Sequence, residues 1–478
     1  MRSTYLVFAA VAAVLLTVGS GTYARADSIG INVLLTRAAT PEDIEDLGTH
    51  GVVLEELPEI HAVTMRTSQL AAIRALSFVA TAEPDCLGQL AGHSSRALAD
   101  LSGGANLWNL DAINVTDFGV GRTVGFDGIG VFIAVLDSGL PYNWREYFPE
   151  DRIAIEFARC FGGGGGNKGT VSSQPERWEH DTDGHGTRVT SVLLGCRYAG
   201  PLALPTTFNG VAPGAKVIPV NLSSFDHLTD IWSSVVSRAL VYVTNLKVGG
   251  VLGKAPLVVN MSVGYPSTDP VLKAAVDYAI AKGVVVVSSA GNEGEAGMRF
   301  PARYPPVISV AAAAWKRQFA YDDPTQIEWI FRDVTEADPE EILLTPFSSR
   351  ELPGQELDIA APGAAIPTAL TLDGRVDYVY FNGTSAACPH VAGVAALMLQ
   401  KNPSLTQTQI EFILKATAMP LAPSCRDVRV RIESQGRYPT FSDLRNLISF
   451  DATVCWGANS TGAGLVQADA ALAATPFP

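Results

Sequence analysis

From about residue 106 onward, short apolar runs alternate with longer segments of helical, amphipathic period. The runs are almost continuously apolar, which is typical of parallel strands that are buried on both faces of a sheet. They are Val131–Leu136, Lys216–Val220, Leu257–Met261, Val284–Ser288 and Val307–Ala312. Strands that alternate with helices predict an α/β fold, a doubly wound, mostly parallel sheet flanked by helices. Sites in such sheets lie at the carboxyl ends of the strands.

The helical segments between these runs carry start signals. Asp230–Lys247 and Pro270–Lys282 are amphipathic, and the second begins with a capping residue followed by proline. Thr406 and Gln409 form a capping box that predicts a helix over Gln407–Ala418. Three polar or glycine-rich stretches interrupt the alternation and are expected to be surface insertions: 160–180, 315–346 and 421–457.

Residues 27–98 show a different pattern, which predicts a small α+β domain. Short strands are expected at Ile31–Thr36, around Val63 and at Phe78–Ala82. Helices are expected after Thr40, where proline and acidic residues form the first turn, and at Ser68–Leu76. The stretch from Asp85 to Asn106 is rich in Gly, Ser and Ala, so we interpret it as a linker and place the domain boundary within residues 86–106.

Residues 1–26 have the features of a secretory signal peptide. A basic residue, Arg2, precedes the apolar run Leu6–Val18, and Ala24-Arg25-Ala26 supplies small residues before a cut at Asp27. An uncleaved membrane anchor is the alternative. No later stretch reaches about 18 uninterrupted apolar residues, so we expect the mature protein to be secreted, in the extracellular or periplasmic space, without a membrane partner.

Composition narrows the function classes. Among 478 residues, Asp and Glu (48) outnumber Lys and Arg (34), which gives a formal net charge of −14. Nucleic acids and anionic membranes are bound mainly through Lys and Arg, so an acidic chain argues against both as partners. Apolar residues make up 47% of the chain, enough to build a large core, which excludes an intrinsically disordered protein.

Six cysteines fit an exported protein, because export makes disulfides available. Their spacings do not match a zinc site. Two pairs each bracket an irregular Gly-, Pro- or Ser-containing stretch, where a crosslink would restrict the unfolded chain most. We therefore predict the pairs Cys160–Cys196 and Cys425–Cys455, with reduced, buried thiols as the alternative.

Three fragments carry candidate chemistry. Asp137 ends the apolar strand that begins at Val131; alone, it could be a helix cap. His185 lies between two glycines just before a helix-forming run; alone, it could be a surface histidine. Ser385 opens a long helix among small residues, where the helix amino end favours developing negative charge. A serine near a helix cap is its structural alternative.

Together these three residues could form a catalytic triad. A serine hydroxyl is a weak nucleophile, so it needs a histidine that accepts its proton and a carboxylate that orients the imidazole. The chain order Asp137, His185, Ser385 is one of the known orders for this arrangement.

The flanking sequences, Asp137-Ser138-Gly139, His185-Gly186-Thr187-Arg188-Val189 and Gly383-Thr384-Ser385-Ala386-Ala387-Cys388-Pro389-His390, resemble the three signatures of the subtilisin-like serine proteases, or subtilases. The resemblance covers about residues 105–475. It implies a subtilisin-like fold and a serine endopeptidase that works through an acyl-enzyme without a required cofactor. Residues 27–98 resemble, more weakly, the family's inhibitory propeptide, which would act as an intramolecular inhibitor and lay its tail in the cleft.

The resemblance also implies binding roles. Asn292, after a buried strand, corresponds to the residue that donates its amide to the oxyanion, together with the backbone N–H of Ser385. Ser262, Val263 and Gly264 would form one wall of the substrate cleft, and Gly264 would let a peptide pair as an added strand. Gly291 would lie in the facing wall. Glu293 would either favour cationic side chains weakly or be a solvated loop carboxylate.

The chain departs from the family pattern in three places, one of which is Thr190-Ser191 where the family usually has the small pair Ala-Gly. Arg188 stands where many members carry a second histidine, and the usual calcium loop before Gly210 offers only the amide oxygen of Asn209. Calcium needs about 6–8 oxygen ligands, so a structural calcium ion lacks support at that loop and no metal site is assigned. His390 and Cys388 are expected to be structural.

The sequence therefore predicts a secreted serine endopeptidase, acting on protein or peptide substrates and made as a self-processing zymogen. Two alternatives come from other classes. A catalytically silent, peptide-binding pseudoprotease is disfavoured by the complete set of site residues. A serine esterase of the α/β-hydrolase type would carry Gly-x-Ser-x-Gly and a different residue order.

Overall fold

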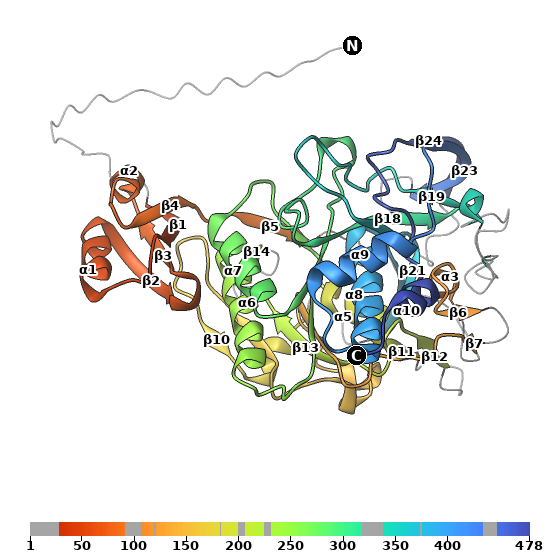
Figure 1. The fold of residues 1–478 in the computed structure, drawn as a ribbon, viewed down its shortest axis with the longest axis horizontal. Helices are drawn as coiled ribbons and strands as arrows, with labels where there is room; N and C mark the ends of the chain where they lie inside the picture. The colour runs from red at the N-terminus through yellow and green to blue at the C-terminus, as the bar shows by residue number, and fades with distance from the viewer. Residues whose placement is uncertain are drawn as a thin grey trace, which may run out of the picture.

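The computed structural model describes residues 28–90, 107–117, 121–181, 183–198, 206–223, 231–317, 334, 338–372, 375–433 and 447–478. The predicted signal peptide and most of the predicted linker lie outside these residues. A small N-terminal module lies at one end of a larger body that contains the described residues from 107 onward (Figure 1). None of the described helices is long and apolar enough to cross a bilayer.

The N-terminal module is a four-stranded antiparallel sheet with two helices. The strands are in the order β2-β3-β1-β4. Its elements are β1 (Ile29–Leu35), α1 (Pro41–His50), β2 (Gly51–Leu57), β3 (Ala62–Thr67), α2 (Leu70–Arg74) and β4 (Val79–Pro84). Helix α1 begins where the sequence predicted it, with a capping box between Thr40 and Asp43. The module has its own apolar core, in which Val33 and Met65 are fully buried.

The larger body is built on one mostly parallel sheet, as predicted. The strand order is β10-β9-β13-β8-β15-β17-β18-β19, with β20 also paired to β18. Five of these strands are the predicted ones: β8 (Phe132–Asp137), β13 (Lys216–Asn221), β15 (Leu257–Met261), β17 (Val285–Ser289) and β18 (Ile308–Trp315). The others are β9 (Arg159–Phe161), β10 (Val171–Ser172), β19 (Ile342–Leu344) and β20 (Ile359–Pro362). Only β10 and β19 pair antiparallel with their neighbours.

Helices cover both faces of this sheet, which confirms the doubly wound arrangement. On β8, Ile133 and Val135 belong to one buried cluster, and Ala134 and Leu136 to another. The first cluster packs on α5 (His185–Leu194), α8 (Thr384–Lys401), α9 (Gln407–Thr417) and α10 (Ala468–Ala474). The second packs on α6 (Ser233–Val248) and α7 (Pro270–Ala281). This alternation follows from the two-residue side-chain period of a strand.

The remaining elements are short or lie in hairpins. They are α3 (Trp108–Asp111), β6 (Thr116–Asp117), β7 (Gly121–Arg122), α4 (Pro175–Trp178), β11 (Gly195–Tyr198), β12 (Thr206–Asn209), β21 (Ile366–Leu372), β22 (Arg375–Phe381), β23 (Ser424–Glu433) and β24 (Leu447–Trp456). The 3-10 turns among the described residues are Pro58–Ile60, Trp144–Glu146, Glu150–Arg152, Gly294–Ala296 and Pro339–Glu341.

Two of the predicted insertions are more integrated than expected. Within 160–180, strands β9 and β10 extend the main sheet and Trp178 is buried, so this stretch is not a detached loop. At 315–346, Trp315 ends β18 and strand β19 pairs with it, while most of the acidic residues lie outside the described part. The third, 421–457, is the β23–β24 hairpin, whose tip is likewise not described.

The predicted linker contains a strand. Leu87–Leu90 forms β5, the central strand of a three-stranded sheet with β14 (Ile231–Trp232) and β16 (Val263–Gly264). The strand runs from the N-terminal module into the larger body (Figure 1). A linker prediction fails here because the backbone groups of β5 pair with partners more than 140 residues away in the sequence, which no local pattern records.

The cysteine predictions have different outcomes. Cys425 and Cys455 lie opposite each other on β23 and β24 and form a disulfide. Cys160 and Cys196 are buried free thiols, so their predicted pairing is wrong. Cys160 pairs across its sheet with Ser172 and Asn221, and Cys196 lies opposite Phe208 in a separate hairpin. Burial raises the pKa of Cys160 to about 11 and that of Cys196 to about 12, which keeps both protonated.

Candidate active site

The structure brings together the elements that carry the three predicted side chains, although 248 residues separate Asp137 from Ser385. His185 contacts Asp137 directly, and α8, which carries Ser385, packs on α5, which carries His185. Asp137 is the last residue of β8, His185 the first of α5, and Ser385 the second of α8. Each side chain is fully buried while strand β5 is in place. The carboxyl end of a central strand and the amino ends of two helices therefore meet at the edge of the sheet, as expected for an α/β fold.

The aspartate holds the histidine in one orientation. His185 Nδ1 lies 2.8 Å from Asp137 Oδ1 and 3.0 Å from Oδ2. A carboxylate only accepts, so Nδ1 carries the proton and Nε2 is left as the basic nitrogen. The imidazole also packs against Phe381 in a T-shaped arrangement, with ring centroids 5.2 Å apart and planes at 90°. These contacts fix both the tautomer and the direction of the ring.

Ser385 lies at the amino end of α8 and contacts Ser262, in the predicted wall of the substrate cleft. Its Oγ donates to the backbone oxygen of Ser262 at 3.1 Å, and the Ser262 hydroxyl donates to the backbone oxygen of Ser385 at 3.1 Å. His185 Nε2 has no hydrogen-bond partner in the described part of the chain. A serine–histidine hydrogen bond often forms only once substrate is bound. In this geometry Nε2 of His185 is therefore free to accept a proton.

The backbone before Ser385 needs glycine. Gly383, the residue before α8, has φ 124°, which a side chain rarely adopts. On the histidine helix, a Cβ at Gly186 would meet the backbone oxygen of Gly139 at 2.3 Å. Both glycines of the sequence signatures therefore permit close contact between backbones around the site.

The orientation of the Asn292 amide follows from its partners. Its Oδ1 accepts from the backbone N–H of Thr384 at 2.9 Å and from the Thr384 hydroxyl at 3.0 Å. A backbone N–H can only donate, so the atom that faces it is the oxygen, and the NH₂ group points the other way. The Asn292 NH₂ group thus points away from Thr384, the residue that precedes Ser385, and its role as an oxyanion donor stays a prediction.

The predicted substrate wall is occupied by the chain itself. Strand β5 pairs antiparallel with β16, with Leu90 opposite Val263 and Gln89 opposite Gly264. On its other edge, Gly88 pairs with Ile231 and Leu87 with Trp232. Gly264 is buried against Arg299, where a Cβ would come within 2.7 Å of the arginine side chain. The segment that sequence reasoning assigned to strand addition does hold an added strand.

The facing segment contains Gly291, with φ 110°, and Glu293. The Gly291 N–H donates to the Thr384 hydroxyl at 3.1 Å. Glu293 is paired with Arg299 at 2.9 Å, and the Ser349 hydroxyl donates to its other oxygen. Its charge is thus neutralised within the protein, and neither expectation for Glu293, a cation-selecting group or a solvated carboxylate, describes it well.

Sequence reasoning missed Asp181, a fully buried carboxylate beside the triad. Its oxygens accept from the backbone N–H groups of Gly184 (2.7 Å) and Thr187 (2.9 Å). They also accept from the hydroxyls of Ser138 (2.7 Å) and Thr187 (2.6 Å). Burial raises the pKa of Asp181 to about 6, against the effect of these hydrogen bonds. Asp181 therefore connects the turn before His185 to the turn after Asp137. Its position four residues before His185 was the feature of the sequence that could have indicated this role.

Three other residues of the sequence signatures, Arg188, His390 and Cys388, are buried. Arg188 is buried, with its guanidinium over Phe381, and it donates to the Gly184 oxygen and to Asp183. Burial lowers its pKa. His390 is also buried, with Nδ1 donating to the Ala386 oxygen and Nε2 accepting from Asn109. Burial lowers the pKa of His390 to about 4. Cys388 is fully buried, and its Sγ lies 3.9 Å from the Met261 backbone oxygen.

A cluster of acidic groups lies away from this site and is already neutralised. Glu356, Asp358 and Glu411 bring their oxygens together. Lys415 Nζ lies among them, 2.7 Å from Glu356 and 2.8 Å from Asp358. A lysine in this position takes the place that a cation would need, so the cluster does not suggest a metal centre.

Comparisons with known proteins agree with this geometry. Residues 128–445 match the sequence model of the Subtilase family. The chain is 31% identical to subtilisin E of Bacillus subtilis over 305 residues, 63% of each chain. It is 32% identical to subtilisin BL of Lederbergia lenta over 298 residues, 62% of this chain and 86% of that one. The chain spans about 63% of the length of several such relatives.

Among solved structures, the fold resembles that of fervidolysin from Fervidobacterium pennivorans, described as a keratinolytic enzyme related to subtilisin. The TM-score is 0.62 at 23% identity, covering 96% of this chain and 63% of that one. At this identity the likeness supports the fold alone.

Proposed function

Since the chain belongs to the Subtilase family, we propose that it is a secreted serine endopeptidase that hydrolyses peptide bonds with the triad Asp137, His185 and Ser385. The observation that carries the proposal is strand β5, a peptide segment paired with the cleft wall Val263–Gly264 beside Ser385. A site that holds an extended peptide next to a buried serine, histidine and aspartate fits peptide hydrolysis better than hydrolysis of small esters.

In the proposed reaction, His185 Nε2 accepts the Ser385 proton as Oγ attacks the peptide carbonyl carbon. Asp137, held to Nδ1 at 2.8 Å, stabilises the imidazolium that forms. The oxyanion accepts from the Asn292 amide and from the backbone N–H of Ser385 at the amino end of α8. The imidazolium then protonates the leaving amine, and a water molecule activated by His185 hydrolyses the acyl-enzyme. None of these steps requires a cofactor.

We also propose that residues 28–90 act as an inhibitory propeptide. The four-stranded module packs on the α6 and α7 side of the larger body through Leu57, Ile60 and Ala62. Its continuation, β5, pairs with the predicted substrate wall, so we expect it to block substrate entry while it is present. Because Ser262, bonded to Ser385, directly precedes the paired residues Val263 and Gly264, we expect self-cleavage just beyond Leu90.

The test is the Ser385→Ala chain, expressed in full and purified without other proteases. The unaltered chain is expected to lose its N-terminal module and to cleave internal bonds of a peptide library. Ser385→Ala is expected to keep its full length and cleave nothing, while Ser460→Ala, which replaces a buried serine elsewhere, matches the unaltered chain. Processing of isolated Ser385→Ala would refute self-cleavage. Turnover of simple esters without peptide cleavage would favour the esterase alternative, and binding without turnover would favour the pseudoprotease.

A further inference from the structure

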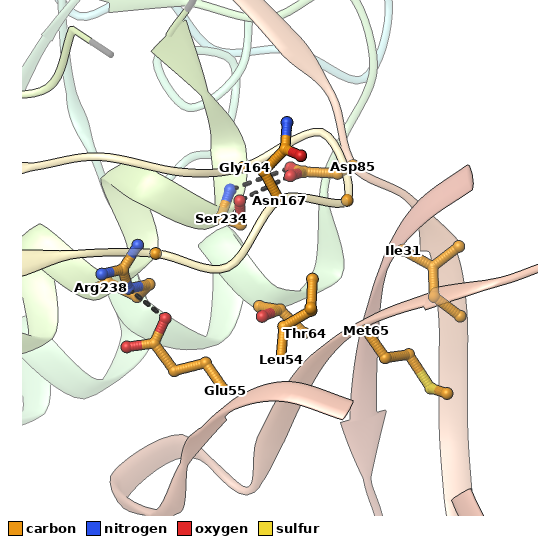
Figure 2. A pocket seen from close by; sticks show the side chains of 12 residues that line it. Ile31, Leu54, Glu55, Thr64, Met65, Asp85, Gly164, Asn167, Ser234 and Arg238 are labelled. Carbon is orange, nitrogen blue, oxygen red and sulfur yellow. Dashed lines mark hydrogen bonds and ion pairs between the residues drawn. The ribbon is translucent and has the colours of Figure 1, made fainter. Parts of the chain in front are cut away.

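A polar pocket lies where the N-terminal module meets the larger body (Figure 2). The module contributes two carboxylates, Asp85 and Glu55. The larger body contributes Ser234 and Arg238 of α6 and the glycine loop between β9 and β10. Charges on the two sides are therefore complementary, in a region that the catalytic chemistry does not use.

Asp85 is bound mainly by groups of the larger body. Its Oδ1 accepts from the Ser234 backbone N–H at 3.1 Å and the Ser233 hydroxyl at 2.9 Å. Its Oδ2 accepts from the Ser234 hydroxyl at 2.6 Å and the Gly165 N–H at 2.8 Å. Asn32, at 3.2 Å, is the one donor from the module that the described residues show. Because Ser233 and Ser234 are the first residues of the 16-residue helix α6, the helix dipole also favours a negative charge here.

Arg238 adds a buried cation to the same pocket. Its side chain is 4% exposed, its Nη1 donates to the Gly162 oxygen at 2.9 Å, and its Nε pairs with Glu55 at 2.5 Å. Its Nη2 has no hydrogen-bond partner among the residues that the structure describes. Burial lowers the pKa of Arg238, and the carboxylates of Glu55 and Asp85 act in the opposite direction. Removal of the module takes away both carboxylates and leaves a cation with unmet hydrogen-bonding capacity.

The pocket lies on the path of the peptide that occupies the cleft. Directly after Asp85, the Cys86 backbone oxygen accepts from the Ser233 N–H at 2.8 Å. Leu87 then pairs with Trp232, and Gln89 with Gly264. A substrate that enters the cleft in the same way as β5 passes through the position of Asp85 before it reaches Ser385.

We propose that, once the module has left, Ser233, Ser234, Gly165 and Arg238 form a binding site for an acidic side chain of an extended peptide substrate. The side chain is the one that takes the place of Asp85, five residues before the position of Leu90. This inference rests on the proposed peptidase function and adds a substrate class to it: peptides that carry Asp or Glu at this distance upstream of the cleaved bond.

The test uses enzyme that is processed from the full chain and fluorogenic peptides with the sequence of residues 83–92, with Cys86→Ser in all. The first carries Glu83→Gln and keeps Asp85. The second carries Glu83→Gln and Asp85→Asn. The third keeps Glu83 and carries Asp85→Asn, so it has the charge of the first at another position.

We expect kcat/KM for the first peptide to exceed that of the other two by about tenfold, since the second and third peptides lack the carboxylate that accepts the charge-assisted hydrogen bonds. Arg238→Gln and Ser234→Ala are each expected to reduce this ratio toward one. Arg317→Gln, which alters an exposed arginine that also pairs with a glutamate, is expected to keep it. Both kcat/KM values of a ratio are measured on the same enzyme preparation, so a variant with a smaller folded fraction lowers both equally and the ratio does not change.

Equal cleavage of the first and second peptides by the unaltered enzyme would overturn the acidic subsite and leave the peptidase intact. If none of the peptides is cleaved, the proposed function fails instead. In that case the affinities of labelled versions of the same peptides for the processed protein, measured by fluorescence anisotropy, test the subsite. About tenfold tighter binding of the first than of the second supports it, and equal binding overturns it.

Discussion

Asp181 is the residue whose replacement most directly tests how the site is held together. It is buried, and it accepts from two backbone N–H groups, of Gly184 and Thr187, and from two hydroxyls. In Asp181→Ala the hydroxyls can turn to other acceptors, and Ser138 already lies 3.2 Å from Asp137. The backbone N–H groups cannot turn, so both lose their partner.

The expected cost follows from that count. A buried donor without a partner costs about 1–3 kcal/mol, so two of them destabilise the fold by about 2–6 kcal/mol. Asp181→Asn keeps one acceptor oxygen but turns an NH₂ group toward the other N–H, and we expect about half that loss. Thr187→Val removes a single hydroxyl and serves as the matched control, with an expected loss of about 1 kcal/mol.

Stability is best measured by urea unfolding of chains that also carry Ser385→Ala, because self-digestion is then absent. All seven tryptophans follow residue 106, so their fluorescence reports the larger body rather than the N-terminal module. In the active chain, Asp181→Ala is expected to lower kcat/KM by about a hundredfold, since a shift of about 1 Å in His185 is enough for that loss. If Asp181→Ala unfolds at the urea concentration of the unaltered chain and retains its kcat/KM, Asp181 does not hold the turn before His185.

Three further predictions follow from named contacts. Asn292→Ala is expected to lower kcat by about 10²–10³ with KM nearly unchanged, measured on a chromogenic peptide, because its amide meets the oxygen only when charge develops; a rise in KM alone would assign it to ground-state binding. Reduction of Cys425–Cys455, which closes a loop of 30 residues, is expected to cost about 3–4 kcal/mol, and an unchanged unfolding midpoint in dithiothreitol would contradict this. The folded-state pKa of His390 is depressed to about 4 from 6.5, so it contributes stability above pH 6.5 that is lost as pH falls toward 4. In His390→Gln, the fall in the free energy of unfolding between pH 6.5 and pH 4, measured in urea, is expected to be about 3 kcal/mol smaller. If the free energy of unfolding of this variant depends on pH as in the unaltered chain, His390 is not responsible.

Local patterns were enough to predict the sheet and the residues at its edge. The five apolar runs are five strands of the main sheet, because a strand that is buried on both faces must be apolar throughout its length. Capping signals at Thr40 and Thr406 placed the starts of α1 and α9, since a cap satisfies N–H groups within a few residues. The candidate triad was visible because its members occupy the ends of such elements, where an α/β fold places its sites.

Contacts between distant parts of the chain were decided only by the tertiary structure. Strand β5 has the composition of a linker and becomes a strand because β14 and β16 offer it backbone partners on both edges. Cys160 and Cys196 lie close in sequence but belong to separate sheets, so they remain thiols. Asp181 and Arg238 derive their importance from burial beside groups that other segments supply. A sequence specifies which groups must be satisfied, whereas the packing of the whole chain decides which partner satisfies each of them.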